Sequence, residues 1–143
     1  MKNLNKYIHD AWSGVKKQTN IENIKVWCEE MGIENYTINS KGEIDVDGKV
    51  DLGRKNFEEL PYKFGTVTGY FDIGSNKNLI SLKNCPDYVK GDFACDRCIN
   101  LDSLEGCPKE VGDEFWCAHC KRKFTVDEVM YLCKVKINKI YPI

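Results

Sequence analysis

Residues 71–92 read FDIGSNKNLISLKNCPDYVKGD, and residues 93–114 repeat the pattern as FACDRCINLDSLEGCPKEVGDE. A third copy begins at Phe115 with FWCAHC and then dissolves. Phe71, Phe93 and Phe115 are therefore spaced by 22 residues, and the Cys-Pro pairs at 85–86 and 107–108 keep the same phase. A fixed period in the twenties is typical of chains that coil into stacked, nearly identical units.

The period predicts an α+β fold whose centre is a short leucine-rich-repeat-like β-solenoid. An imperfect earlier repeat runs from about 50 to 70, where Leu60 and Val67 keep the spacing of Leu82 and Val89. About three rungs are therefore expected. Before them, apolar alternation on both sides of the turn at 39–42 predicts a pair of strands at 36–38 and 43–46.

Apolar residues at helical spacing predict two helices before the repeats. The first spans about residues 3–17. The second begins after a capping box formed by Thr19 and Glu22 and ends at Gly32. We expect these helices to cover the open end of the solenoid, because a bare first rung would expose its apolar interior.

The pattern changes again after the last Cys-x-x-Cys pair. Thr125 and Glu128 form another capping box and predict a short helix, which is followed by a predicted strand at 135–141. The whole chain, 1–143, is predicted to be a single domain. It would consist of an N-terminal helical cap (1–34), the repeat solenoid (35–120) and a C-terminal helix-strand cap (121–143).

The charges of the chain nearly cancel, with 21 Lys+Arg against 22 Asp+Glu and a net charge of −1. This balance argues against nonspecific nucleic-acid binding, which relies on concentrated basic charge. The N-terminus lacks the apolar core of a signal peptide, and no apolar run approaches the roughly 20 residues that span a bilayer. We therefore expect a cytoplasmic protein without a membrane partner, in which the eight cysteines are reduced or metal-bound.

Two Cys-x-x-Cys pairs, Cys95 with Cys98 and Cys117 with Cys120, match the spacing of four-cysteine zinc sites. Stacked coils would place Cys95 beside Cys117 and Cys98 beside Cys120, because neighbouring strands lie about 4.8 Å apart. The spacing predicts a structural Zn²⁺ held by these four thiolates. A catalytic zinc is not expected, since four protein sulfurs leave no open position for water.

The repeat itself offers a second explanation of this spacing, because it places residues 22 apart at equivalent sites. Leucine-rich repeats often carry Asn or Cys at this turn, and Asn76 occupies the position of Cys98 in the preceding repeat. Buried, reduced thiols are therefore the alternative to zinc. The chain has no phosphate-binding glycine loop, no zinc-protease or serine-hydrolase motif and no catalytic Cys-His arrangement, so an enzyme is not expected.

The repeat also resembles one found in uncharacterised proteins of large tailed bacteriophages, approximately S-L-x-G-C-P-x-x-V-x-G-x-F-x-C-x-x-N. Here it appears from Ser81 to Cys95 and again from Ser103 to Cys117, and residues 36–52 are similar to the first segment of that family. The family pattern has Asn where this chain has Cys98 and Cys120, which favours a metal acquired by this member. The resemblance implies a phage origin and a small accessory protein in the host cytoplasm, without catalytic residues.

Solenoids expose a regular ladder of side chains, which favours protein recognition. We therefore expect a non-enzymatic phage protein that binds and inhibits a host protein as an anti-defence factor. The expected contact residues alternate with the buried phenylalanines: Tyr70, Asp72, Asp92, Ala94, Glu114 and Trp116. Trp116 is the main candidate, since an exposed Trp beside a rigid strand often dominates binding. The alternative to an exposed Trp116 is that its side chain is partly buried under the C-terminal cap.

Two other functions stay open. A zinc-containing nucleic-acid-binding protein would use the basic residues near the metal, and its binding would weaken steeply with salt. These residues are Arg97, Lys121, Arg122 and Lys123. A sponge for a signalling nucleotide would need a pocket, most easily at an interface between copies of the chain.

Overall fold

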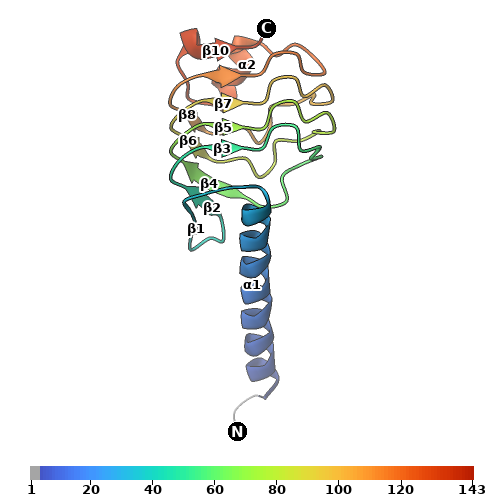
Figure 1. Ribbon diagram of the computed structural model, residues 1–143, viewed down its shortest axis with the longest axis vertical. Helices are drawn as coiled ribbons and strands as arrows, with labels where there is room; N and C mark the ends of the chain where they lie inside the picture. The colour runs from blue at the N-terminus through green and yellow to red at the C-terminus, as the bar shows by residue number, and fades with distance from the viewer. Residues whose placement is uncertain (1–3) are drawn as a thin grey trace. The chain divides into compact units, whose positions relative to one another are not determined.

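The computed structural model describes the backbone of residues 4–143 and the side chains from Gly14 onward. Over these residues the fold is α+β, with two α-helices and two five-stranded, mostly parallel sheets (Figure 1). The chain divides into two compact units, of which the first ends at Gly32 and the second runs from Ile33 to Ile143. No helix in the described part is both long and apolar enough to cross a bilayer.

The first unit contains one continuous helix, α1 (Leu4–Glu30), and the prediction of two helices is wrong. The Thr19 hydroxyl donates to the carbonyl of Val15 at 3.0 Å instead of capping a new helix. A threonine that bonds back to the preceding turn leaves the helix intact. The Glu22 carboxylate accepts a hydrogen bond from the Gln18 side chain at 3.2 Å, so the two halves of the predicted capping box do not meet.

Burial along α1 is confined to its C-terminal half within the described side chains. Ile24 and Cys28 are buried, whereas every residue from Gly14 to Asn20 is exposed. The apolar stripe predicted for the second helix is therefore confirmed. The stripe predicted for the first helix lies on side chains outside the described residues, apart from Val15, which is exposed. Gly32, with a φ of 72°, ends the helix as expected.

The second unit begins with the predicted pair of strands. β1 (Tyr36–Ile38) and β2 (Ile44–Val46) pair antiparallel, and Ile44 and Val46 face the core. The turn between them is held by Asn39, whose side-chain oxygen accepts hydrogen bonds from the N–H groups of Lys41 and Glu43. The first sheet continues in parallel from β2 through β4 (Phe64–Val67), β6 (Tyr88–Val89) and β8 (Glu110–Val111).

The second sheet contains β3 (Val50–Asp51), β5 (Phe71–Asp72), β7 (Phe93–Ala94), β9 (Phe115–Trp116) and β10 (Ile140–Tyr141). All of its strands are parallel, and Figure 1 shows β3, β5 and β7 stacked in chain order. Phe71 pairs with Phe93, and Phe93 pairs with Phe115. The register predicted from the 22-residue spacing is therefore confirmed.

Phenylalanine rings form a continuous column through the stacked repeats. We call each repeat, with its strand in either sheet, a coil. The ring centroids of Phe71 and Phe93 are 6.1 Å apart, and those of Phe93 and Phe115 are 5.1 Å apart. Phe64, from the first sheet, packs edge-on against Phe71 at 5.1 Å. All four side chains are fully buried. Each contributes on the order of 1.5–3 kcal/mol from burial of apolar surface, so the column is a principal part of the core.

Glycines form the corner between the two sheets. A Cβ atom added to Gly69 would lie 2.6 Å from the carbonyl carbon of Gly48, and one added to Gly91 would lie 2.8 Å from that of Gly69. Real Cβ contacts are longer than this, so any side chain here would push neighbouring coils apart. Gly69 and Gly91 are therefore needed at this corner because successive backbones touch there. In the last repeat Asp113 takes the equivalent position, and its N–H donates to the carbonyl of Gly91.

The C-terminal segment adds a helix and a strand, as predicted, but the strand is shorter than expected. Thr125 caps α2 (Val126–Leu132), and its hydroxyl accepts from the N–H of Glu128 at 3.1 Å. Residues 137–139 form a 3₁₀ turn, η1 (Ile137–Lys139), rather than part of the strand predicted at 135–141. Ile137 is exposed, so burial of its side chain does not stabilise an extended strand at this position. Within the predicted strand at 135–141, only Ile140 and Tyr141, which form β10, pair with β9.

Candidate functional site

The predicted partner-binding residues form two rows on the second sheet. Asp72, Ala94 and Trp116 are register partners on β5, β7 and β9, so they lie side by side. Tyr70, Asp92 and Glu114 each directly precede a buried phenylalanine and form the second row. All six side chains are at least partly exposed. We call these six residues the strand face.

Trp116 is partly covered by the C-terminal strand, in agreement with the alternative to a fully exposed side chain. Its indole stacks on the Tyr141 ring with 4.1 Å between centroids and 13° between planes. The indole N–H donates to the Glu114 carboxylate at 3.0 Å, and the Tyr141 hydroxyl lies 3.5 Å from the other oxygen of that carboxylate. The strand face therefore ends in an aromatic pair held in one geometry.

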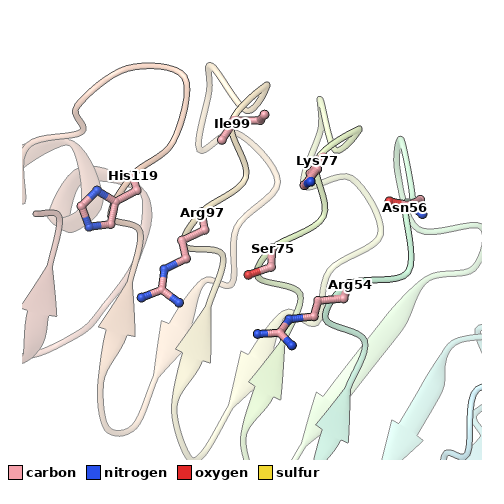
Figure 2. A pocket seen from close by; sticks show the side chains of 7 residues that line it. All are labelled: Arg54, Asn56, Ser75, Lys77, Arg97, Ile99 and His119. Carbon is pink, nitrogen blue, oxygen red and sulfur yellow. The ribbon is translucent and has the colours of Figure 1, made fainter.

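Beside the strand face, four successive turns carry Arg54, Ser75, Arg97 and His119 at equivalent positions. All four have positive φ, between 56° and 59°. Figure 2 shows their side chains in a row along one hollow, which we call the turn groove. The groove has a volume of about 740 Å³, and its other lining residues are Asn56, Lys77 and Ile99.

The turn groove is lined by cations and contains no carboxylate among its lining residues. Within the part of the chain that the structure describes, neither Arg54 nor Lys77 has an ion-pair partner, and Arg97 lies 4.0 Å from Asp96. Arg54 and Lys77 therefore form no ion pair, although the charge of Arg54 acts on the Asp72 carboxyl in the adjoining hollow.

A row of carboxylates adjoins these cations. Asp51, Asp72 and Asp96 line an adjoining hollow of about 340 Å³, together with Arg54, Ser75 and Arg97, which line the turn groove as well. Burial raises the pKa of the Asp72 carboxyl, and the nearby Asp51 and Asp96 add to this effect. The N–H of Gly74 and the positive charge of Arg54 oppose it. The surface formed by the strand face and the turn groove thus presents rows of opposite charge.

The predicted zinc ligands lie inside the same coils, next to a buried asparagine. Asn76 donates to the carbonyls of Leu52 and Ile73 at 2.9 and 2.8 Å, and its oxygen accepts from the N–H of Lys55 at 2.9 Å. Cys98 follows at the equivalent position, and its thiol lies 3.5 Å from the carbonyl of Ile73. In the next coil, the Cys120 thiol lies 3.3 Å from the carbonyl of Cys95. The two thiols therefore take the place of the asparagine amide as donors.

The four cysteines are close enough to influence one another. A hydrogen bond with Cys120 and burial hold the pKa of the Cys95 thiol well above its ordinary value, and the sulfurs of Cys117 and Cys98 add to the shift. Burial raises the pKa values of Cys98 and Cys117 to about 12. The hydrogen bond with Cys95 lowers the pKa of Cys120. Thiols with raised pKa values are protonated near neutral pH.

Among the described residues, no group of three or more His, Cys, Asp or Glu side chains is arranged to hold a metal ion. Zinc would require deprotonated sulfurs turned away from the carbonyls that they now contact. The present arrangement matches buried, reduced thiols, with all eight cysteines free of disulfides. The zinc site stays a prediction.

The basic residues predicted for nucleic-acid binding line two hollows, and Lys121, Arg122 and Lys123 share the second with His119. Arg97 lies in the turn groove, whereas Arg122 pairs with Glu128 at 2.7 Å and with Asp102 at 3.6 Å. Lys121 lies 4.0 Å from the same Asp102. Acidic neighbours thus offset much of the basic run at 121–123. No sequence motif marks Arg54, Ser75 and Lys77, although the 22-residue phase relates Ser75 to Arg97.

Comparison with known proteins gives no match: no family model fits the chain, and neither a curated protein nor a solved structure is similar to it. The resemblance to the phage repeat family therefore stays a prediction.

Proposed function

We propose that this protein is a phage-encoded, non-enzymatic binding protein that occupies and inhibits a host protein as an anti-defence factor. Its scaffold would be a short leucine-rich-repeat-like solenoid of about three rungs, capped at both ends. The observation that best supports this function is the stacked pair of Trp116 and Tyr141 at the end of the strand face. Tyr and Trp are enriched at protein interfaces because they bury a large area with few rotatable bonds.

The strand face is well ordered before any partner arrives. Backbone hydrogen bonds such as Phe93 N–H to Glu114 C=O, at 2.8 Å, hold each strand to the next. The Asp92 carboxylate also accepts from the Glu114 N–H at 3.0 Å. Little conformational entropy is therefore lost when these side chains meet a partner, and this favours binding.

The charges favour a protein partner over a nucleic acid. Carboxylates on the strand face, such as Asp72 and Asp92, adjoin the cations Arg54 and Arg97. A nucleic-acid backbone presents one sign of charge, and the carboxylate row would repel it. A protein surface offers both signs and complements the two rows.

The test is affinity capture from phage-infected cells followed by mass spectrometry, with the wild type and two variants. Trp116→Ala removes the aromatic pair from the strand face, and Tyr88→Ala removes an exposed tyrosine, 47% accessible, from the first sheet. We expect the wild type and Tyr88→Ala to retain one host protein that Trp116→Ala loses.

Circular dichroism must show that Trp116→Ala is folded under the capture conditions. If a folded Trp116→Ala variant captures the same protein as the wild type, the interface lies outside the strand face. Purified partner then allows inhibition of its activity to be measured directly, with Tyr88→Ala as the matched control.

A further inference from the structure

The turn groove uses residues that the turn conformation itself does not favour. Left-handed backbone at a non-glycine residue costs about 1 kcal/mol, and glycine or asparagine usually occupies such positions. Here Arg54, Ser75, Arg97 and His119 all have φ between 56° and 59°. The side chains at these four positions therefore have a role that offsets the backbone strain.

The positions of Arg54 and Arg97 suggest what that role is. They lie on turns two coils apart, with the turn of Ser75 between them, and coils are about 4.8 Å apart. In Figure 2 both guanidinium groups point to the same side of the turn groove as the Ser75 hydroxyl. Two long cationic side chains thus flank a hydroxyl across roughly 10 Å of backbone.

We propose that the turn groove binds a small phosphorylated ligand of nucleotide size. The phosphate lies over Ser75 and accepts hydrogen bonds from Arg54 and Arg97, because the planar guanidinium matches phosphate geometry and is always charged. Lys77 adds a third positive charge from the same wall. This site goes beyond the proposed partner-binding function, which uses the strand face.

The far end of the turn groove suits the organic part of the ligand. Ile99 is 55% exposed and offers an apolar surface, and the His119 imidazole follows on the next coil (Figure 2). A planar ring can stack against the imidazole while its edge contacts Ile99. The volume of about 740 Å³ lies in the range of roughly 300–1,000 Å³ that is usual for small-molecule sites.

The surroundings favour a small ligand over an extended strand of nucleic acid. The row from Arg54 to His119 covers only four coils, or about 14 Å. The carboxylates of Asp51, Asp72 and Asp96 flank it and would repel a backbone that continued past the row. A ligand with a single phosphate meets less of this repulsion than a chain of phosphates does.

The test is isothermal titration calorimetry on the full chain at low salt with four probes: adenosine monophosphate, adenosine, inorganic phosphate and a ten-nucleotide single-stranded oligothymidylate. We expect the monophosphate to bind, inorganic phosphate to bind more weakly, and adenosine and the oligonucleotide to bind less tightly than the monophosphate. Weaker binding of phosphate alone reports the contribution of the organic part.

The matched variants are Arg54→Gly and Arg97→Gly, with Lys90→Gln as the control. Glycine removes the guanidinium and also relieves the positive φ, so both variants keep the fold. Each should weaken monophosphate binding about 10- to 100-fold, the usual effect of losing a charged hydrogen bond. Lys90, an exposed cation outside the turn groove, should have no effect when it is replaced.

Four results would overturn the proposal. These are no binding of the monophosphate at millimolar concentration, equal binding of adenosine and its monophosphate, unchanged affinity in Arg97→Gly, and tighter binding of the oligonucleotide than of the monophosphate. The last result would assign the turn groove to nucleic acid.

Discussion

The side-chain amide of Asn76 lies 2.9 Å from the carbonyl oxygen of Leu52 in the preceding coil. The same amide oxygen accepts from the N–H groups of Lys55 and Phe57, so one side chain satisfies backbone groups of two coils. Asn76 is the buried polar residue of the core among the described side chains. It links the turn of one coil to the next, and Cys98 continues that link with a weaker donor.

Replacement of this asparagine should be strongly destabilising. In Asn76→Ala, the buried carbonyls of Leu52 and Ile73 and two partly buried N–H groups lose their partner, and each buried unsatisfied group costs about 1–3 kcal/mol. We expect urea denaturation to show a loss of about 3 kcal/mol or more in the free energy of unfolding. Asn78→Ala, two residues away and exposed, is the control and should change stability by less than about 0.5 kcal/mol. Equal effects of the two variants would contradict the role of Asn76.

The glycine corner predicts a second contrast. Gly69→Ala places a methyl group 2.6 Å from the backbone of Gly48, so the coils must separate and thermal stability should fall by several degrees or more. Gly14→Ala is the matched control, because Gly14 lies in α1 with no atom within 4 Å of the added Cβ. It should stabilise the protein by about 0.5–1 kcal/mol. A neutral Gly69→Ala would show that the coils are not in contact at this corner.

Metal analysis decides between zinc and reduced thiols. If zinc is present, elemental analysis of the reduced, purified protein should find about one Zn²⁺ per chain, and chelation should lower the melting temperature. Cys98→Ser should then lose the metal and much of its stability. Cys107→Ser is the control outside the four predicted ligands and should retain the metal.

Reduced protein without stoichiometric metal would end the zinc hypothesis. In that case Cys98→Ser should be tolerated, because a serine hydroxyl also donates to the carbonyl of Ile73.

Alkaline pH should destabilise the protein through its buried thiols. Burial raises the pKa values of Cys107 and Cys133 to about 12 from an ordinary 9.0. Above pH 9 the unfolded chain releases protons that the folded chain keeps, so the free energy of unfolding falls by about 1.4 kcal/mol per pH unit for each such thiol. Below pH 8 these thiols leave stability unchanged.

Urea denaturation under reducing conditions between pH 8 and pH 11 measures this slope. Cys133→Ala removes one thiol and should make the decline shallower, whereas Asn78→Ala should leave it unchanged. A decline of equal slope in Cys133→Ala would show that this thiol does not titrate on unfolding.

The parts of the fold that were predicted well are those in which the sequence repeats. The 22-residue spacing predicts the pairing of Phe71 with Phe93, since equivalent residues of stacked coils become neighbours. The capping box at Thr125 is confirmed for the same kind of reason, because its hydrogen bond is local. The capping box at Thr19 is wrong because the hydroxyl that would accept from the N–H of Glu22 can also donate, and in the continuous helix it donates to the carbonyl of Val15.

The candidate site was harder to predict. The spacing of the four cysteines is the same for a zinc site as for a repeated turn, so it cannot separate the two. Arg54 and Arg97 line the same hollow only because the chain coils twice between them. The residues next to either arginine in the sequence do not indicate that the two will be neighbours. The partial cover of Trp116 depends on Tyr141, 25 residues further along the chain.

The amino-acid sequence alone determined the period of this protein, the identity of its buried column and the turn at which polar groups face inward. These follow from local spacing, which coiling preserves. Tertiary structure alone decided which charges are neutralised, how the sulfurs are oriented and which side chains share a hollow. Those properties depend on distances between coils and on the closing strand at Ile140–Tyr141, and such distances exist only once the backbone hydrogen bonds between coils have formed.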